Sequence, residues 1–289
     1  MYVWLAGIVL LLNPAVQTPT RSGQTGMFAD AIAYESFIGR WSRLVAPPFV
    51  EFARIRDGDR VLDVGSGTGS LAFSIAASRP RCRVVGIDPS AQYVSYAGSK
   101  NTNSNVHFEI GDAQQLVFPP AQFDAATSLL VLNFIPDVRK AMSELRRVTR
   151  PGGVISAAVW DYGEGMQMLR LFWDSAVALD PKAEPLDEKH MPLCRAGELA
   201  GLFRTAGLAD VREQALEIKL RFASFDDYWN PFLKGQGPAG SYVSKLPEHQ
   251  RAALRDRLKS LTLARLDAGG GFELGARVWA ARGTVPQSK

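Results

Sequence analysis

The feature that most constrains the fold is a short apolar run that ends in closely spaced glycines. Residues 61–69 read Val-Leu-Asp-Val-Gly-Ser-Gly-Thr-Gly. Apolar side chains with helical spacing follow at once, at Leu71, Ile75 and Ala76. Glycine has no Cβ, so this turn lets the backbone approach a bound molecule closely. Because open α/β sheets bind ligands at the carboxyl ends of their strands, the segment predicts a ligand-binding turn between a strand and a helix.

Strand and helix patterns alternate along the rest of the chain. We expect strands at 60–64, 84–87 and 106–110, within 123–132, at 154–160, within 208–222 and at 275–281, and helices at 70–77, 137–148 and 198–206. An insertion at 223–271 contains a helix that starts at Pro247 and carries Leu254, Leu258, Leu261 and Leu266. The alternation predicts an α/β fold, with a doubly wound, mostly parallel sheet covered by helices on both faces.

Length and charge narrow the class of protein further. The 289 residues, 46% of them hydrophobic, favour one enlarged domain at 27–289 with its core at 58–160. A net charge of +4 without a long basic run does not favour nucleic-acid binding. Cys82 and Cys194 are too far apart to predict a disulfide framework or a metal site, which fits a reducing, cytoplasmic compartment.

The amino terminus carries an apolar run, residues 2–12, that is too short for a stable membrane span. No Lys or Arg precedes the run, unlike in a signal peptide. Three interpretations stay open for residues 1–26: an extension upstream of a chain that starts at Met27, an export or surface-anchoring segment, and a packed helix.

Acidic residues stand where the expected strands end. Asp63 lies inside the first strand, where a carboxylate suits a ligand with a cationic near end. Asp88 ends the second strand about 20 residues after the glycines, where a carboxylate can accept both hydroxyls of a ribose. Asp112 and Ala113 follow the third strand and can meet the edge of an adenine ring. The alternative for Asp88 and Asp112 is a local capping role.

Together these segments resemble the class I S-adenosylmethionine-dependent methyltransferases, especially the type 11 and ubiquinone/menaquinone-biosynthesis enzymes. The resemblance rests on residues 61–69, 86–90 (Gly-Ile-Asp-Pro-Ser), 111–114 (Gly-Asp-Ala-Gln), 123–128 and 145–153, in the order of the family's motifs. It implies a seven-stranded, Rossmann-like sheet with a reversed last strand, an amino-terminal helical cap and S-adenosyl-L-methionine as cofactor.

The resemblance also implies roles for single residues. Asp63 and the turn residues are expected at the methionine part of the cofactor, Asp88 with Pro89 at the ribose, and Ser128 with Leu129 beside the sulfonium. Arg40, in the segment 34–43 that resembles a cofactor cap, is expected to pair with the methionine carboxylate; the alternative is a solvated helix residue. The full expected cofactor set is Arg40, Asp63, Gly65, Ser66, Gly67, Gly69, Asp88, Pro89, Asp112, Ala113, Ser128 and Leu129.

The acceptor is expected to be a small molecule bound by the segments 161–197 and 223–271. The candidate pocket residues are Trp160, Tyr162, Met166, Phe172, Tyr228 and Trp229, although a Met and aromatic stripe is more often core than pocket. No residue is assigned as the catalytic base; His190 is the candidate, and a structural or solvent-facing histidine is the alternative.

Other functions stay open or are disfavoured by the motifs. Residues 132–135 read Leu-Asn-Phe-Ile, which lacks the Asn/Asp-Pro-Pro-aromatic motif of many DNA and protein-amide methyltransferases. The G-x-G-x-G spacing differs from the G-x-G-x-x-G of nicotinamide enzymes. A catalytically silent cofactor-binding or partner protein, and a methyltransferase of protein or RNA, remain as alternatives. The acceptor atom and the oligomeric state are not predicted.

Overall fold

A computed structural model describes residues 30–287, which build around one seven-stranded sheet of order β3-β2-β1-β4-β5-β7-β6. Parallel pairing joins β3, β2, β1, β4 and β5, whereas β7 is antiparallel to both of its neighbours. The doubly wound, mostly parallel sheet with a reversed last strand is therefore confirmed. The apolar extension, residues 1–26, lies outside the described residues.

The strands agree with the expected ones in the first half of the chain; in the second half two of them, β5 and β7, are longer than expected. They are β1 (Arg60–Val64), β2 (Arg83–Asp88), β3 (Val106–Ile110), β4 (Phe123–Leu129), β5 (Thr149–Trp160), β6 (Ala209–Phe222) and β7 (Phe272–Thr284). The last two form a long antiparallel pair that runs from Ala209↔Thr284 to Phe222↔Phe272. In β7 buried and less buried positions alternate, as expected for a strand packed on one face.

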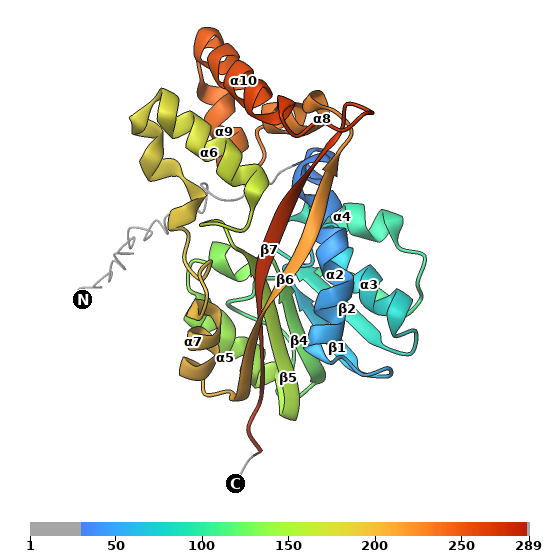
Figure 1. Ribbon diagram of the computed structural model, residues 1–289. Coiled ribbons are helices and arrows are strands. Elements are labelled where there is room, and N and C mark those ends of the chain that lie inside the picture. Colours follow the sequence, from blue (N-terminus) through green and yellow to red (C-terminus); the bar gives the residue numbers. More distant parts are fainter. Residues whose placement is uncertain (1–29, 288–289) are drawn as a thin grey trace, which may run out of the picture.

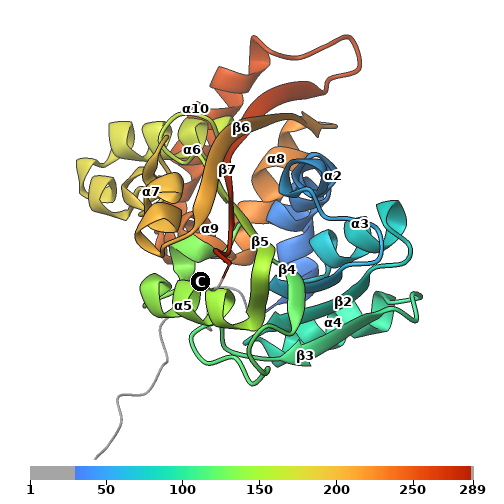
Figure 2. The same cartoon turned by 90° about the horizontal axis from the view of Figure 1, so that it is seen from below.

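Helices cover both faces of the sheet. The principal ones are α2 (Arg40–Ala53), α3 (Ser70–Ser78), α4 (Ala91–Lys100), α5 (Val138–Val148) and α7 (Glu198–Thr205). Figures 1 and 2 show α2 and α3 on one side of the sheet, with α5 and α7 on the other. Asp137 caps α5 by accepting the Lys140 N–H at 3.0 Å, as the sequence predicts. The central strands β1 and β4 are buried on both faces, which explains their continuous apolar sequence.

Shorter helices flank the carboxyl ends of the parallel strands. Before α2 the chain forms α1 (Ala31–Tyr34) and a π-helix, η1 (Glu35–Gly39), and after β4 it forms η2 (Leu132–Phe134). The expected amino-terminal helical segment is thus present. These elements approach the sheet at the edge where the glycine turn lies.

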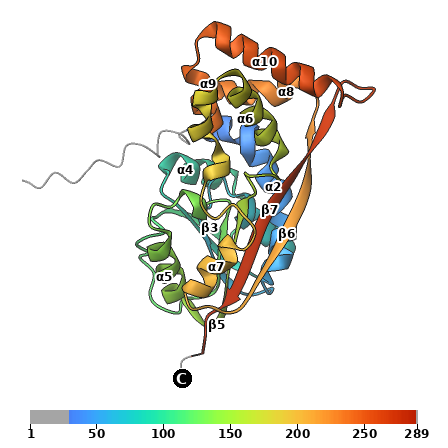
Figure 3. The same cartoon turned by 60° about the vertical axis from the view of Figure 1, so that its left-hand side comes forward.

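A further group of helices, which we call the upper layer, lies beyond this edge of the sheet (Figures 1 and 3). It comprises α6 (Gln167–Leu179), η3 (Pro181–Leu186), η4 (Glu188–His190), α8 (Phe225–Trp229), η5 (Asn230–Lys234), α9 (Gly237–Lys245) and α10 (Glu248–Leu263). Leu254 and Leu258 of α10 are buried against this layer, but Leu261 and Leu266 are exposed, so the expected apolar face is shorter than the sequence indicated. Within residues 30–287, no helix has the length and apolarity needed to cross a membrane.

Candidate cofactor-binding site

The glycine turn leaves β1 and enters α3 in a left-handed conformation. Gly65, Gly67 and Gly69 have φ of +73°, +52° and +94°. The amides of Gly65 and Ser66 both donate to the carbonyl of Ile87, at 2.8 and 2.9 Å, which ties the turn to β2. A Cβ on Gly65 would lie 2.5 Å from the Val131 side chain, so that position combines a positive φ with no room for a side chain.

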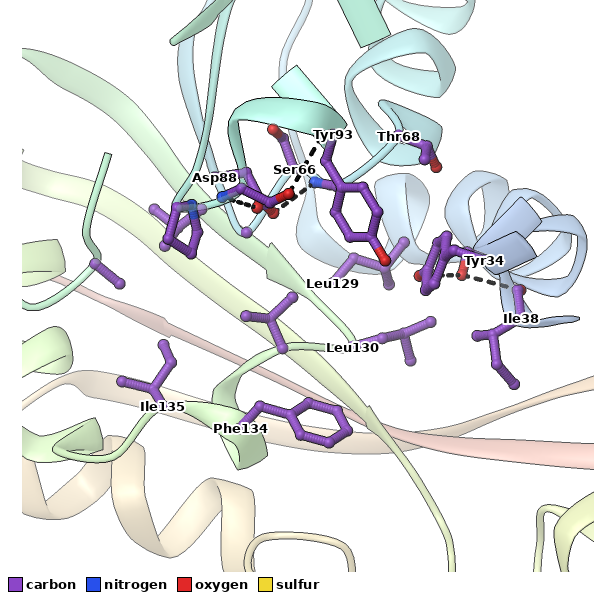
Figure 4. A pocket seen from close by; sticks show the side chains of 18 of the residues that line it. Tyr34, Ile38, Ser66, Thr68, Asp88, Tyr93, Leu129, Leu130, Phe134 and Ile135 are labelled. Atoms are coloured by element: carbon purple, nitrogen blue, oxygen red, sulfur yellow. Dashed lines mark hydrogen bonds between the residues drawn. The ribbon is translucent and has the colours of Figure 1, made fainter. Parts of the chain in front are cut away.

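A cavity of about 410 Å³ opens at this turn, a volume in the range of small-molecule sites. It extends from the ends of β1 and β2 past the end of β4 to the upper layer. Figure 4 shows Ser66, Asp88 and Tyr93 along one side and apolar side chains opposite. Of the expected cofactor set, the residues that line it are Asp63, Gly65, Ser66, Gly67, Asp88, Pro89, Asp112, Ala113 and Leu129.

Asp63 is fully buried in the wall of the cavity. Neither carboxylate oxygen has a hydrogen-bond partner among the described residues. Burial, and then the nearby Asp88 carboxylate, raise the pKa of Asp63 to about 7. An unpartnered carboxylate of this kind favours a cation in the cavity, because a buried polar group without a partner is costly.

Asp88 is held rigidly at the end of β2. Its Oδ2 accepts the Gly67 N–H at 3.0 Å and its Oδ1 accepts the Ser90 N–H at 2.9 Å, as dashed lines in Figure 4 show. Burial raises the pKa of Asp88, and these two backbone hydrogen bonds oppose the rise. Since a carboxylate has about four acceptor sites, each oxygen can still accept a hydroxyl from a ligand.

Asp112 follows β3 and forms a local turn. Its Oδ1 accepts the backbone N–H of Gln114 at 2.9 Å and the side-chain amide of Gln114 at 3.2 Å. The local role expected as the alternative for Asp112 therefore exists. The turn also presents Asp112, Ala113 and Gln114 to the cavity, so a capping role and a ligand contact are compatible.

Residues 34–42, which end in the first turn of α2, close one side of the cavity; the sequence predicts a cofactor cap here but does not single out these side chains. Tyr34, Phe37, Ile38 and Ser42 line it. The ring of Tyr34 lies 5.3 Å from that of Tyr93, centroid to centroid (Figure 4). Phe37 and Ile38 belong to a π-helix, a form that is often found at functional sites.

The structure does not place Arg40 at the cavity, because its guanidinium is engaged elsewhere. It donates to Asp227 Oδ1 at 2.7 Å and to the Asp227 carbonyl at 3.1 Å, and it lies 4.1 Å from the centre of the Trp41 ring. Arg40 is not part of the cavity wall. It joins α2 to α8, and no sequence signal connects these two positions.

Two other members of the expected cofactor set also lie outside the wall. Gly69 packs against α3 and β3 instead, and a Cβ there would meet the Phe73 ring at 2.5 Å. Ser128 is buried inside β4, whereas its neighbour Leu129 lines the cavity. The loop after β4 contributes further apolar wall residues that the sequence analysis did not name: Leu130, Val131, Phe134 and Ile135.

Two of the six candidates for the acceptor pocket lie at the cavity. Trp160 and Tyr162, at the end of β5, line the cavity. The remaining four candidates, Met166, Phe172, Tyr228 and Trp229, are buried in the hydrophobic core and do not line it. Phe172 stacks on Phe232 at 4.6 Å, which shows why an aromatic stripe here serves packing.

His190, the candidate base, does not reach the cavity either. Its side chain is 48% exposed, and its Nε2 lies 2.9 Å from Glu184 Oε1. The cavity wall in this segment is instead provided by Glu188, with Leu169 of α6. The sequence analysis missed Glu188 because a charged residue in a polar stretch usually points to solvent.

The sheet and its flanking helices define a Rossmann-like fold, and its cavity at the glycine turn contains the unpartnered carboxylate of Asp63. The Methyltransferase domain family model matches residues 62–157. An O-methyltransferase, cnsE of Penicillium expansum, is 30% identical over 232 residues, which are 71% of this chain and 79% of that protein. The chain belongs to the class I S-adenosylmethionine-dependent methyltransferases, whose cofactor is S-adenosyl-L-methionine.

Two further comparisons cover the same region. The 2-phytyl-1,4-naphtoquinone methyltransferase of Synechococcus elongatus is 35% identical over 126 residues, 42% of this chain and 52% of that protein, so the chain spans about half the length of this relative. The phosphoethanolamine N-methyltransferase 2 of Haemonchus contortus, solved with S-adenosyl-L-methionine, superposes with a TM-score of 0.55 at 18% identity, over 91% of this chain and 58% of that one. The latter likeness concerns the fold.

Proposed function

We propose that this protein transfers a methyl group from S-adenosylmethionine to a small, apolar acceptor. The observation that carries the proposal is a single cavity with two unlike ends. One end has the glycine turn and the carboxylates of Asp63 and Asp88, and the other has an apolar wall that includes Trp160 and Leu169. Such a cavity can hold a charged nucleoside and an apolar molecule side by side.

We call the end of the cavity at the glycine turn the donor end and the opposite end the acceptor end. The donor end fits the cofactor because the Asp63 carboxylate there has no hydrogen-bond partner among the described residues. Asp63, with Gly65 at the turn, would hold the cationic methionine part. Asp88 and Pro89 would hold the ribose, and Asp112 with Ala113 would meet the adenine. Ser66 and Gly67 would contact the cofactor from the glycine turn, and Leu129 would lie beside the sulfonium.

S-adenosylmethionine supplies a methyl group that its sulfonium has already activated. The residues of this chain then have to align an acceptor atom for in-line displacement, at about 3–3.5 Å from the methyl carbon, and exclude water. The apolar side chains of Leu130, Phe134 and Ile135 support water exclusion, since they line the cavity next to the donor end.

The nature of the wall supports an apolar acceptor with a ring. Trp160, Tyr162 and Leu169 contribute large side chains to the acceptor end. The name of one relative, a 2-phytyl-1,4-naphtoquinone methyltransferase, agrees with a ring-bearing acceptor.

The test has two steps. Calorimetry with S-adenosylmethionine and S-adenosylhomocysteine should show saturable binding of both, and absence of binding would refute the site. Incubation of the enzyme and S-adenosylmethionine with fractionated small-molecule extracts should then produce S-adenosylhomocysteine, the product left after methyl transfer. Binding without release in any fraction would favour a silent binding protein, and release only with protein or RNA fractions would favour a macromolecular acceptor.

A further inference from the structure

Glu188 is a buried carboxylate at the acceptor end of the cavity. Glu188 lies on η4 and is only 5% exposed. It lines the cavity together with Tyr162 and Leu169. Among the titratable residues of the wall, Asp63, Asp88 and Asp112 belong to the donor end that the cofactor is proposed to occupy. Glu188 is therefore the carboxylate whose position suits a contact with the acceptor.

One hydrogen bond fixes the orientation of this side chain. The Trp173 Nε1–H of α6 donates to Glu188 Oε2 at 2.7 Å. The second oxygen, Oε1, has no hydrogen-bond partner within residues 30–287. The carboxylate thus has one anchored oxygen and one that can accept a proton.

The charged groups around Glu188 do not neutralise it. Arg170 donates to both oxygens of Asp187, at 2.8 and 2.7 Å, and to the Tyr162 carbonyl at 3.0 Å, so its guanidinium is committed to Asp187. Burial raises the pKa of Glu188 to about 7; the Trp173 hydrogen bond and Arg170 oppose this rise and Asp187 adds to it. Tyr162 and Cys194 also lie close enough to interact electrostatically with Glu188, and burial raises the pKa of both.

We propose that Glu188 is the catalytic base of this enzyme and that the acceptor is a small aromatic hydroxyl compound. This inference rests on the proposed function. The hydroxyl proton passes to Glu188 Oε1, and the oxygen uses a lone pair to form the new bond to the methyl carbon. The carbon–sulfur bond breaks with its electron pair remaining on sulfur, which yields the aryl methyl ether, S-adenosylhomocysteine and protonated Glu188.

The geometry explains why a hydroxyl on a ring matches this end of the cavity. The ring would pack on Trp160 and Leu169, and the hydroxyl would donate to the unpartnered Oε1. A base whose pKa lies near neutrality combines availability with proton affinity, and general base catalysis of this kind typically contributes 10²–10⁴-fold.

The test compares Glu188→Gln with Glu184→Gln. Glutamine has nearly the same shape and its amide oxygen can still accept from Trp173, but it cannot take a proton. Glu184 lies in the same segment, pairs with His190 and does not line the cavity, so its variant is the matched control. The probes are 2-naphthol, largely protonated at mildly alkaline pH, and 4-nitrophenol, largely ionised there.

We expect Glu188→Gln to lower kcat for 2-naphthol about 100-fold or more. Methylation of 4-nitrophenol should change less than about threefold, since the phenolate needs no base. At saturating S-adenosylmethionine, the wild-type rate with 2-naphthol should rise with pH through about 7, and this rise should be lost in the variant. An equal loss for both probes, no loss for either, or no methylation of 2-naphthol by the wild type would overturn the proposal.

A second readout needs no turnover. Excited 2-naphthol loses its proton to a base within hydrogen-bond reach and then emits as naphtholate. With S-adenosylhomocysteine bound, the wild type and Glu184→Gln should show naphtholate emission, and Glu188→Gln should show emission of the neutral form. Identical emission from all three proteins would count against Glu188. Failure of the wild type to bind S-adenosylmethionine would instead refute the proposed function.

Discussion

Asp63 is the residue whose protonation links stability to cofactor binding. Its folded-state pKa of about 7 lies above the unfolded value of about 3.9. Between these values the folded chain binds more protons than the unfolded chain, so its stability falls as pH rises through this window. Above about pH 7 the buried charge is present, and it is compensated when a cation binds.

We therefore expect Asp63→Asn to stabilise the protein and to weaken its binding. The free energy of unfolding should increase by at least about 1 kcal/mol more at about pH 8 than at about pH 5, because asparagine removes the buried charge that exists at the higher pH. Urea unfolding at both pH values measures this. Affinity for S-adenosylmethionine should fall roughly tenfold. If the stability of Asp63→Asn depended on pH in the same way as that of the wild type, Asp63 would not be the group that causes this dependence.

Asp88 supports a separate prediction at the ribose. Asp88→Ala should weaken S-adenosylmethionine binding by at least about 1.5 kcal/mol, because two charge-assisted hydrogen bonds to the ribose are lost. Calorimetry gives the affinity, and thermal unfolding shows whether the glycine turn still folds without its bond to Gly67. Asp57→Ala is the control, since Asp57 pairs with Arg81 on the surface. Unchanged affinity of Asp88→Ala would argue decisively against this site.

The acidic residues could be placed from the sequence because each one stands within a strand or directly after it. Parallel strands bring their carboxyl ends to one edge, so position along the chain gives position in space. Arg40 and His190 could not be assigned in this way, since their partners Asp227 and Glu184 depend on how the upper layer packs. Glu188 was missed for the same reason: only packing against Trp173 distinguishes it from a solvated residue.

At the level of elements, the Arg40–Asp227 ion pair connects the amino-terminal helix to the upper layer. The two side chains are only 23% and 31% exposed, and Arg40 also stacks on Trp41. A partly buried, stacked guanidinium contributes more than an exposed ion pair, through packing as well as charge.

Arg40→Ala should therefore destabilise the protein by about 1–2 kcal/mol. Because Arg40 does not line the cavity, affinity for S-adenosylmethionine should change less than twofold. Urea unfolding and calorimetry measure the two quantities, and Arg43→Ala, which removes a more exposed guanidinium from its pair with Glu35, provides a comparison. A large loss of affinity with little loss of stability would restore the role expected from the sequence.

The elements of the first half of the chain were predictable because local pattern and final environment agree. In β1 and β3 the expected and observed bounds coincide. The ends of β7 were not predictable, since this strand continues beyond the apolar pattern where it pairs with β6. Leu261 and Leu266 show the converse case: they continue the helical spacing of apolar residues, but the rest of the described structure leaves them exposed.

At the scale of the whole molecule, the two segments expected to bind the acceptor contribute unequally to the cavity wall. The segment 161–197 contributes Tyr162, Leu169 and Glu188 to the wall, whereas the insertion 223–271 contributes Gly237 and Pro238. The aromatic residues that suggested the insertion as the acceptor site are in the core. Sequence alone could not divide them in this way, because core and pocket side chains have the same composition.

Exchange of segment 161–197 with that of a relative should therefore change acceptor preference more than exchange of 223–271. We expect the ratio of rates on 2-naphthol and 4-nitrophenol to shift about tenfold or more for the first exchange, as in pockets altered by one or a few contacts. Affinity for S-adenosylmethionine should be retained in both chimaeras. A larger shift from the 223–271 exchange would place acceptor selection in the insertion.

The position of β7 also has a consequence for biosynthesis. This strand is translated after β5 and β6, yet it fills the gap between them. Until residues 272–284 have left the ribosome, the flank of β5 lacks its neighbour, and such open flanks attract foreign strands. Premature termination within this stretch should therefore produce aggregates and not a shortened enzyme, and the yield of native protein should depend on how well chaperones shield the nascent chain.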